Sequence, residues 1–440
     1  MKAIATGPLI IFFLLLLLTL AARIREGTWY SPFAFFGLLW SFIIGFSIFT
    51  APEYYFSVAA LIFISINIFV FIVGGTLSEN LFRSTRKIPA ATLPATEKIL
   101  RFHFYLSGAA GFFALFFLLH DSGIHFAELL GKRRLMDISK VLTNNRYEGE
   151  RLSGHTMICM TICYSGCLTA GRFLAISKDK FRKMESLTIL IPLLLFTLIY
   201  TARAVFIFAV LLFLSSFVTS YILTHKRDSL LFSKRNIVLI GVAFLFVPMI
   251  FLFTQATRMG ISKFSWDSLA FIIDHLKVYF SGNLSAFSYW FDERGAHEHL
   301  YMGSYTFAGL SEWTGGEARE LGIYGKAIDL DGHMQFSNVY TLFRFLADDF
   351  GITGTILIWF FLGIVSRIIY NKVLTGDFVA AAALCGLFTW MLFSFVTSVF
   401  AYNSVLFGWL MYVLIAFAAE KFIPGAELKP EAKREFHQLT

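Results

Sequence analysis

The sequence has few charged residues, few cysteines and none of the short motifs that mark the common soluble catalytic sites. Charged residues make up 15% of the 440 positions, well below the roughly 25% that is usual in soluble globular domains. No HExxH, paired CxxC, P-loop or GxSxG element occurs, so no zinc, nucleotide or serine-hydrolase mechanism is indicated. The missing P-loop argues against a nucleotide-driven pump.

The four cysteines lie within apolar runs and indicate no disulfide framework. Cys159, Cys163 and Cys167 recur every fourth residue, with His155 one turn earlier, so these side chains would share a helix face. At 1.5 Å rise per residue, His155 and Cys167 are roughly 18 Å apart and cannot bind one ion together. We therefore interpret the cysteines as small packing residues and expect neither a metal nor a cofactor.

Apolar residues are abundant: they form 57% of the chain, and phenylalanine alone occurs 53 times. A helix needs about 20 apolar residues to cross the hydrocarbon of a bilayer, whereas strands of a barrel would alternate over about 10 residues. We therefore predict an all-α polytopic membrane protein of about 11 transmembrane helices, with residues 1–440 forming a single integral membrane domain. The eleven apolar runs are 7–22, 31–50, 56–77, 102–120, 155–175, 187–202, 204–223, 236–254, 350–370, 378–399 and 404–420.

The distribution of lysine and arginine predicts the orientation. With the N-terminus outside and the C-terminus in the cytoplasm, 22 of the 37 basic residues lie inside. The first run is then a retained span rather than a signal peptide, and 255–349 is a large outer loop between spans 8 and 9. The outer loop 121–154 is itself rich in arginine and lysine. Either the topology differs there, or the loop is basic because it binds an anion.

Two features are expected within the outer loop 255–349. Apolar residues at 266, 269, 273, 276 and 280 fall on one face of a helix. That helix would lie in the membrane interface or pack against the ends of the spans. The glycine-rich stretch 314–332 is expected to be a surface loop or a lid.

A polar block, Asn338–Gly354, directly precedes the ninth apolar run. Within it, Tyr340, Arg344 and Asp348 are spaced by four residues and would form one polar stripe on a helix. Ionisable groups at membrane depth are costly and usually mark a functional site. The block therefore indicates chemistry or binding at the membrane face, and a purely structural Arg344–Asp348 ion pair is the alternative.

Arg203 interrupts an otherwise apolar region between two predicted spans. Its planar guanidinium matches phosphate oxygens and stays charged at any relevant pH. Snorkelling to lipid headgroups is the alternative. Arg258, which follows the eighth span, has the same two interpretations.

Four segments stand out in the second half of the chain: Thr201–Arg203, Tyr279–Trp290, Gly303–Ala308 and Asn338–Gly354. As an ordered set spanning residues 190–370, they resemble the oligosaccharide repeat-unit polymerases of bacterial surface polysaccharide synthesis, the Wzy-type O-antigen polymerases. The resemblance implies a GT-C-like glycosyltransferase, a multi-pass protein of the bacterial inner membrane. Such an enzyme moves a growing glycan from one undecaprenyl diphosphate to a sugar hydroxyl of another lipid-linked repeat unit.

The resemblance also assigns roles to residues. The general base that activates the acceptor hydroxyl would be one of Asp348, His333 and Glu148. The diphosphate would be bound by arginines, namely Arg203, Arg258, Arg344 and, in the basic outer loop, Arg146 and Arg151. The glycan would contact Tyr289, Trp290, Trp313, Tyr340 and Asn338.

The partners implied are the lipid-linked donor and acceptor, membrane lipid, a chain-length regulator and a flippase, with no nucleic acid. An O-antigen ligase is one alternative, because it uses the same donor, although its sequence pattern differs from these blocks. A lipid-linked glycan flippase or transporter is another. A translocation path would place polar residues at mid-span positions, whereas the ionisable groups of this sequence cluster at one face.

Overall fold

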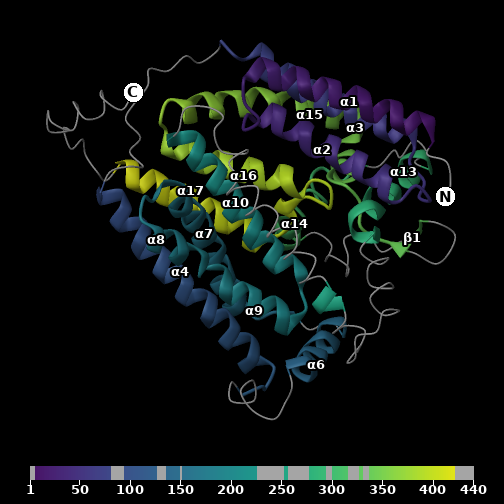
Figure 1. The fold of residues 1–440 in the computed structure, drawn as a ribbon. Coiled ribbons are helices and arrows are strands. Elements are labelled where there is room, and N and C mark those ends of the chain that lie inside the picture. The colour runs from purple at the N-terminus through teal and green to yellow at the C-terminus, as the bar shows by residue number, and fades with distance from the viewer. Residues whose placement is uncertain are drawn as a thin grey trace, which may run out of the picture.

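The computed structural model is a bundle of long helices (Figure 1). It describes residues 5–80, 94–125, 135–148, 151–224, 252–255, 277–293, 300–315, 327–330 and 336–421. Strand structure in this part of the chain is limited to β1 (Ile328–Asp329) and β2 (Phe336–Ser337), which pair antiparallel with Ile328 opposite Ser337. The fold is therefore all-α in character.

Nine helices among the described residues are long and apolar enough to cross a membrane. This confirms the class of polytopic membrane protein. They are α1 (Thr6–Glu26), α2 (Pro32–Thr50), α3 (Val58–Leu77), α4 (Pro94–Asp121), α7 (Gly154–Ile176), α8 (Lys180–Leu187) with α9 (Leu190–Tyr200), α10 (Arg203–Thr224), α15 (Leu342–Leu374) and α17 (Asn403–Lys421). A tenth apolar helix, α16 (Phe378–Phe393), is shorter.

Serine side chains and small residues explain how these helices begin and pack. Ser57 caps α3 by accepting a hydrogen bond from the backbone N–H of Ala60, an interaction that stabilises helix N-termini by about 1 kcal/mol. α3 then packs closely against α15. A Cβ atom on Gly74 would lie 2.2 Å from the carbonyl oxygen of Phe360, and one on Gly363 equally close to that of Phe71. Only glycine permits this backbone contact, as in other membrane helix pairs.

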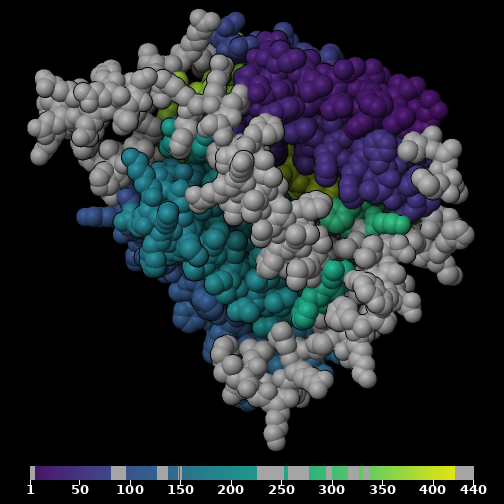
Figure 2. Space-filling model, viewed as in Figure 1, coloured from purple at the N-terminus to yellow at the C-terminus, as the bar shows by residue number. Residues whose placement is uncertain are grey.

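The surface of the bundle is apolar where lipid would surround it. α1 lies on the outside of the molecule, as the purple atoms in Figure 2 show. Leu14, Leu17 and Ile24 of this helix are between 57% and 80% exposed. Such an exposed apolar surface would be unfavourable in water, whereas in a bilayer it contacts apolar lipid chains.

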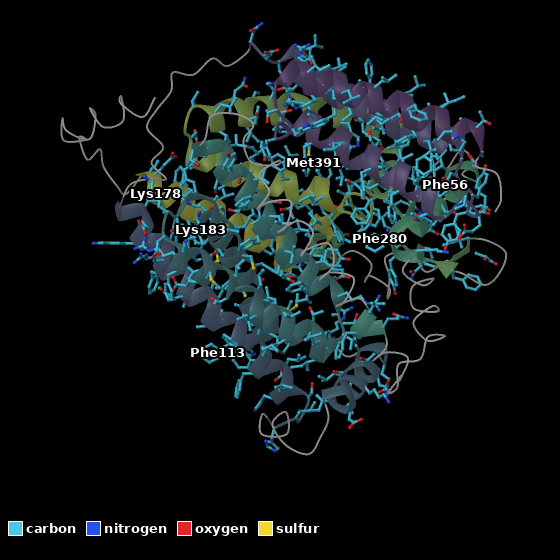
Figure 3. All side chains as sticks on the ribbon, viewed as in Figure 1. Phe56, Phe113, Lys178, Lys183, Phe280 and Met391 are labelled. Carbon is cyan, nitrogen blue, oxygen red and sulfur yellow. The ribbon has the colours of Figure 1, made fainter. Side chains whose placement is uncertain are left out.

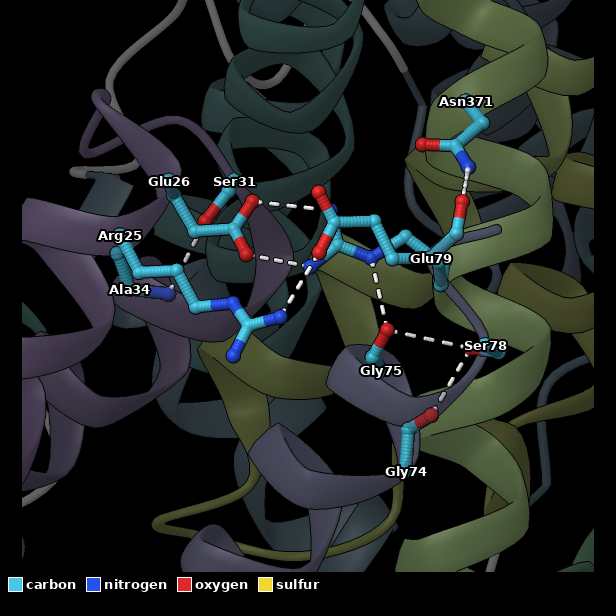
Figure 4. A network of polar contacts seen from close by, with 10 residues as sticks. Arg25, Glu26, Ser31, Ala34, Gly74, Gly75, Ser78, Glu79 and Asn371 are labelled. Carbon is cyan, nitrogen blue, oxygen red and sulfur yellow. Dashed lines mark hydrogen bonds and ion pairs between the residues drawn. The ribbon is translucent and has the colours of Figure 1, made fainter. Parts of the chain in front are cut away.

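Polar contacts gather at two opposite ends of the bundle. At one end, which we call the α13 end, Tyr55 and Ser57 both donate to the carboxylate of Asp292, with oxygen–oxygen distances of 2.6 Å. At the other, the Arg367 end, Arg367 binds Glu26 across the bundle. Figure 4 shows the polar network around Glu26, including the ion pair of Arg25 with Glu79 and the carbonyl of Gly75.

Most predicted spans correspond to helices, but not all their bounds agree. The eighth run, 236–254, lies outside the described residues apart from 252–254, so the count of eleven stays a prediction. The tenth run was predicted to reach residue 399, whereas α16 ends at Phe393 and a short 3-10 turn, η3 (Val399–Ala401), follows. Residues 396–399 are Val-Thr-Ser-Val, which have low helix propensity. The backbone carbonyl of Ser394, directly after α16, accepts a hydrogen bond from the backbone N–H of Leu342 at 2.8 Å.

The predicted features of the outer loop are described only in part. The expected amphipathic helix 266–280 lies outside the described residues up to position 276, and from Lys277 on the chain enters the π-helical turn η2 (Val278–Gly282). This turn continues directly into α13 (Asn283–Glu293). The glycine-rich stretch 314–332 is described only at 314–315 and 327–330. The orientation of the bundle and the placement of 255–349 outside remain predictions.

Candidate functional site

The continuous segment η2–α13 is the framework of the candidate site. It lies at the α13 end, where Asp292 holds it to the α2–α3 connection through Tyr55 and Ser57. The hydrogen bond to Asp292 is the main reason why the pKa of Tyr55 is raised, so this phenol stays protonated and keeps donating. The η2–α13 segment is therefore fixed at one end of the bundle.

Arg203 lies at the first position of α10, directly after a break between two helices. Thr201 in this break has a φ of 53°, a left-handed conformation that is uncommon for a residue other than glycine. The guanidinium of Arg203 is buried, with 6% exposure. Its Nε donates to Thr254 Oγ1 at 2.7 Å, its Nη2 donates to Gln255 Oε1, and its Cζ lies 4.8 Å from the centre of the Tyr279 ring. Together these contacts fix the position of the guanidinium at the η2–α13 segment.

Arg344 is the second arginine that touches the η2–α13 segment. Its Cζ lies 3.8 Å from the ring centre of Tyr340 and 5.2 Å from that of Trp290. Its Nε donates to Asp348 Oδ2 at 3.3 Å, and both of these side chains are nearly buried, at 13% and 11% exposure. Burial raises the pKa of Tyr340 although Arg344 opposes this shift, so the phenol is neutral. The stripe spaced by four residues is thus a chain of contacts that ends on a carboxylate.

Asp349 has a different role from its neighbour Asp348, which the sequence did not indicate. Its side chain is fully buried. One carboxylate oxygen accepts from the backbone N–H of Tyr305 at 3.0 Å, and the other accepts from that of Thr306 at 2.6 Å. The backbone carbonyl of Asp349 also accepts from the N–H of Met302 at 3.0 Å. Asp349 therefore holds the turn 301–307 against α15.

Just beyond these carboxylates, α15 is broken at Gly351. Its φ of 75° and ψ of 174° lie in a region that is essentially restricted to glycine. Within the predicted block Asn338–Gly354, residues 342–350 therefore form a short helix at the α13 end, and a separate helix that spans the bundle follows. This break allows Arg344 and Asp348 to face the η2–α13 segment while the rest of α15 packs on α3.

The basic loop 121–154 contains a helix that the sequence analysis missed, α6 (Leu135–Tyr147). Its signal was present, because Ile138 and Leu142 are four residues apart, and both are 1% exposed in the structure. The hydroxyl of Thr143 lies 2.7 Å from that of Thr201. The loop therefore folds onto the break between α9 and α10, two residues before Arg203.

Arg146 and Arg151 line one cavity of 250 Å³ beside this helix, together with Asp121 and Tyr200. The Cζ of Arg146 lies 5.6 Å from the centre of the Tyr200 ring. Two of the predicted diphosphate ligands are thus brought together beside Tyr200. Glu148 follows α6 and is exposed.

The predicted glycan-binding residues lie in different environments. Tyr289 packs against Tyr55 with ring centres 4.9 Å apart, and Trp290 and Tyr340 are 8% and 1% exposed. Trp313, on α14 (Ala308–Trp313), is 68% exposed and stacks on Phe407 at 5.2 Å. A sugar ring could approach Trp313 without a rearrangement, whereas Tyr340 would have to leave its contact with Arg344. Asn338 is half-buried, and Arg258 and His333 lie outside the described residues.

Arg203 and Arg344 both contact aromatic rings of the same segment, although they are 141 positions apart in the sequence. The two rings, Tyr279 and Trp290, are separated by eleven residues, which corresponds to roughly 16 Å along a helix. Within the described ranges, no group of three or more His, Cys, Asp or Glu side chains is arranged to hold a metal ion.

Fold and site together define a multi-pass membrane protein with buried arginines, aromatic rings and a paired carboxylate at one end of its bundle. Comparisons with protein-family models, with curated proteins and with solved structures found no match. The assignment of a function therefore depends on the residues and their geometry.

Proposed function

We propose that the protein is a glycosyltransferase that polymerises undecaprenyl-diphosphate-linked oligosaccharide repeat units into a surface polysaccharide. The reaction would take place at the periplasmic face of the bacterial inner membrane, with the α13 end on that side. One observation carries the proposal. The four blocks on which the resemblance depends contact one another: Arg203 touches Tyr279, Arg344 touches Trp290, and Asp349 binds the turn after Gly303.

The proposed chemistry needs cations for a diphosphate and a base for a hydroxyl. Arg203 and Arg344 would supply positive charge to the lipid diphosphate of the bound substrates, since guanidinium binds phosphate oxygens strongly. Asp348 would accept the proton of the acceptor hydroxyl as its oxygen attacks the anomeric carbon of the donor. The bond between that carbon and the diphosphate oxygen breaks, and the lipid diphosphate leaves with the electron pair.

Donor activation resides in the substrate, which agrees with the lack of a nucleotide motif in the sequence. The leaving group is already a diphosphate, so the protein has only to bind and orient two lipid-linked glycans and move one proton. Arg203 and Arg344 lie beside different rings of the η2–α13 segment, Tyr279 and Trp290, which are eleven positions apart in the sequence. We therefore propose that the two arginines serve different substrate molecules.

The test is complementation of a strain that lacks its polymerase and carries the matching glycan cluster. Lipopolysaccharide is separated on a gel, and wild type is compared with Arg203→Ala, Arg344→Ala and Asp348→Asn at equal abundance in the membrane. Wild type should give a ladder of repeat units, and each variant should collapse to a single repeat. Loss of a general base typically lowers a rate by about 10²- to 10⁴-fold.

Arg25→Ala is the matched control, because Arg25 is an arginine at the other end whose partner Glu79 is exposed. It should produce a normal ladder. A wild type without a ladder would reject polymerisation. Single-length transfer to the lipid A core would indicate a ligase instead, and export without any transfer would indicate a flippase. Normal ladders from all three site variants would reject the site but not the reaction.

A further inference from the structure

A large cavity lined by described residues lies away from the candidate site, at the Arg367 end. It has a volume of 620 Å³ and is bounded by the first turns of α4, the last turns of α7 and the short helix α8. A volume of this size is typical of sites for small ligands. No residue of the candidate site lines it.

One wall of the cavity is apolar. Leu100 and Phe104 of α4 and Phe173 and Ile176 of α7 form it. These helices also carry side chains that point away from the bundle, for example Phe102 with 71% exposure. Phe173 and Ile176 are half-buried, so an acyl chain could contact this wall.

The helix α8 marks the level of the membrane interface beside this cavity. Phe181 and Met184 are 76% and 72% exposed on it, while Lys180, Arg182 and Lys183 alternate with them in the sequence. Exposed apolar side chains interspersed with basic ones are typical of a helix that lies in the headgroup region. The polar part of the cavity is therefore at the depth of lipid phosphates.

The acidic residues that line the cavity are all bound to neighbouring groups. Glu97 accepts from Arg182, Glu185 accepts from the hydroxyl of Tyr105 at 2.6 Å, and Asp179 caps the backbone N–H of Phe181 at 3.0 Å. Arg182 lies near two of these carboxylates, Glu97 and Asp179, and so reduces the repulsion that an anion in the cavity would meet.

Basic residues outnumber the acidic ones in the lining, four to three. Arg172 is 3% exposed and its guanidinium lies over the ring of Phe378, with Cζ 4.1 Å from the ring centre. Lys178 is exposed, and no ion pair to another described residue is formed by it. Figure 3 shows Lys178 and Lys183 at the same end of the bundle, but only Lys178 lines the cavity.

We propose that this cavity binds one anionic phospholipid of the surrounding bilayer. The headgroup phosphate lies between Lys178 and Arg172, and an acyl chain lies along Leu100, Phe104 and Ile176. The long basic side chains match the phosphate in charge, and the apolar wall selects a lipid over a water-soluble phosphate. The site is independent of the proposed polymerisation, because it lies at the opposite end of the molecule.

Native mass spectrometry of the full-length protein in detergent tests this site. The protein is titrated with dioleoyl phosphatidylglycerol, and in parallel with dioleoyl phosphatidylcholine, which has no net charge. We expect one phosphatidylglycerol to bind more tightly than phosphatidylcholine. Lys178→Gln should weaken it about fivefold, since each lysine near a lipid surface contributes on the order of a factor of five.

Lys183→Gln is the matched control, because it removes the same charge from the same region but not from the cavity. It should bind phosphatidylglycerol as wild type does. Ile176→Trp fills the apolar wall and should reduce binding with both lysines in place, which separates the acyl-chain contact from the charge. Thermal unfolding of each variant identifies any that are misfolded.

Several results would overturn the proposal. Equal weakening by Lys178→Gln and Lys183→Gln would mean that phosphatidylglycerol binds through general surface charge. Equal affinity for phosphatidylcholine would mean that charge is not recognised. Displacement of the lipid by glycerol phosphate at the same concentration would indicate a site for a water-soluble phosphate.

Discussion

Replacement of Arg367 by methionine should destabilise the protein more than the same replacement of Arg25, another arginine at its end of the bundle. The side chains of Arg367 and Glu26 are 5% and 7% exposed. Arg367 donates through Nη1 to one oxygen of Glu26 at 3.0 Å and through Nη2 to the other. Its Nε donates to the carbonyl oxygen of Gly75 at 3.0 Å. The pair therefore joins α1, α3 and α15.

The expected cost follows from what the substitution leaves behind. In Arg367→Met, Glu26 is a buried carboxylate without its cation, a situation that costs about 3–5 kcal/mol of folding free energy. In the double variant Glu26→Gln/Arg367→Met, no charge remains, and most of this cost should disappear. A buried pair can be replaced by neutral groups with little loss, whereas breaking it on one side is costly.

Unfolding of the purified protein in mixed micelles, followed by circular dichroism as the denaturing detergent increases, measures these differences. Arg25→Met is the control, because the Arg25–Glu79 pair is about half exposed and such pairs contribute at most about 1 kcal/mol. A double variant that is as unstable as the sum of its two single variants would refute the reasoning, as would an Arg367→Met variant no less stable than Arg25→Met.

Two further predictions concern the candidate site. Gly351→Ala should destabilise the protein by about 1–3 kcal/mol through its backbone conformation alone, since the added Cβ would meet only Leu300, at 3.7 Å. Chemical denaturation should detect this loss of stability. Gly154→Ala is the control and should be nearly neutral, because nothing lies within 4 Å of its new Cβ. Burial raises the pKa of Tyr305 to about 12, so the contribution of this phenol to stability is complete below its ordinary pKa and is lost as the pH rises towards 12. Thermal midpoints measured between about pH 9 and pH 11 should therefore fall less steeply in Tyr305→Phe than in wild type, and equal slopes would contradict this.

Sequence periodicity predicted the class of fold and one part of the site. Long apolar runs identify spanning helices because the bilayer demands about 20 apolar residues, and the spacing of Arg344 and Asp348 placed them in contact. Both inferences use local geometry. The helix α6 was within reach of the same reasoning, because Ile138 and Leu142 lie on one face, but the surrounding charges obscured the pattern.

Contacts between distant segments were beyond such reasoning. Nothing in the local sequence indicates that Arg203 lies on Tyr279, because the two residues meet only after α9 and α10 are packed. The same applies to Asp349, whose partners Tyr305 and Thr306 precede it by more than forty positions. Asp348 and Asp349 are adjacent and cannot be distinguished in the sequence. Their roles differ because Asp349 binds the turn 301–307.

Arg203 and Arg367 illustrate how packing distinguishes arginines that the sequence cannot. Both interrupt or end an apolar run, and both are buried. Arg367 is matched by the carboxylate of Glu26, so its charge is neutralised within the protein. Arg203 donates to the hydroxyl of Thr254 and the amide oxygen of Gln255 and lies over the ring of Tyr279, so its contacts reach the η2–α13 segment. Arg367 therefore holds three helices together, whereas Arg203 lies beside the segment to which we propose that the substrates bind.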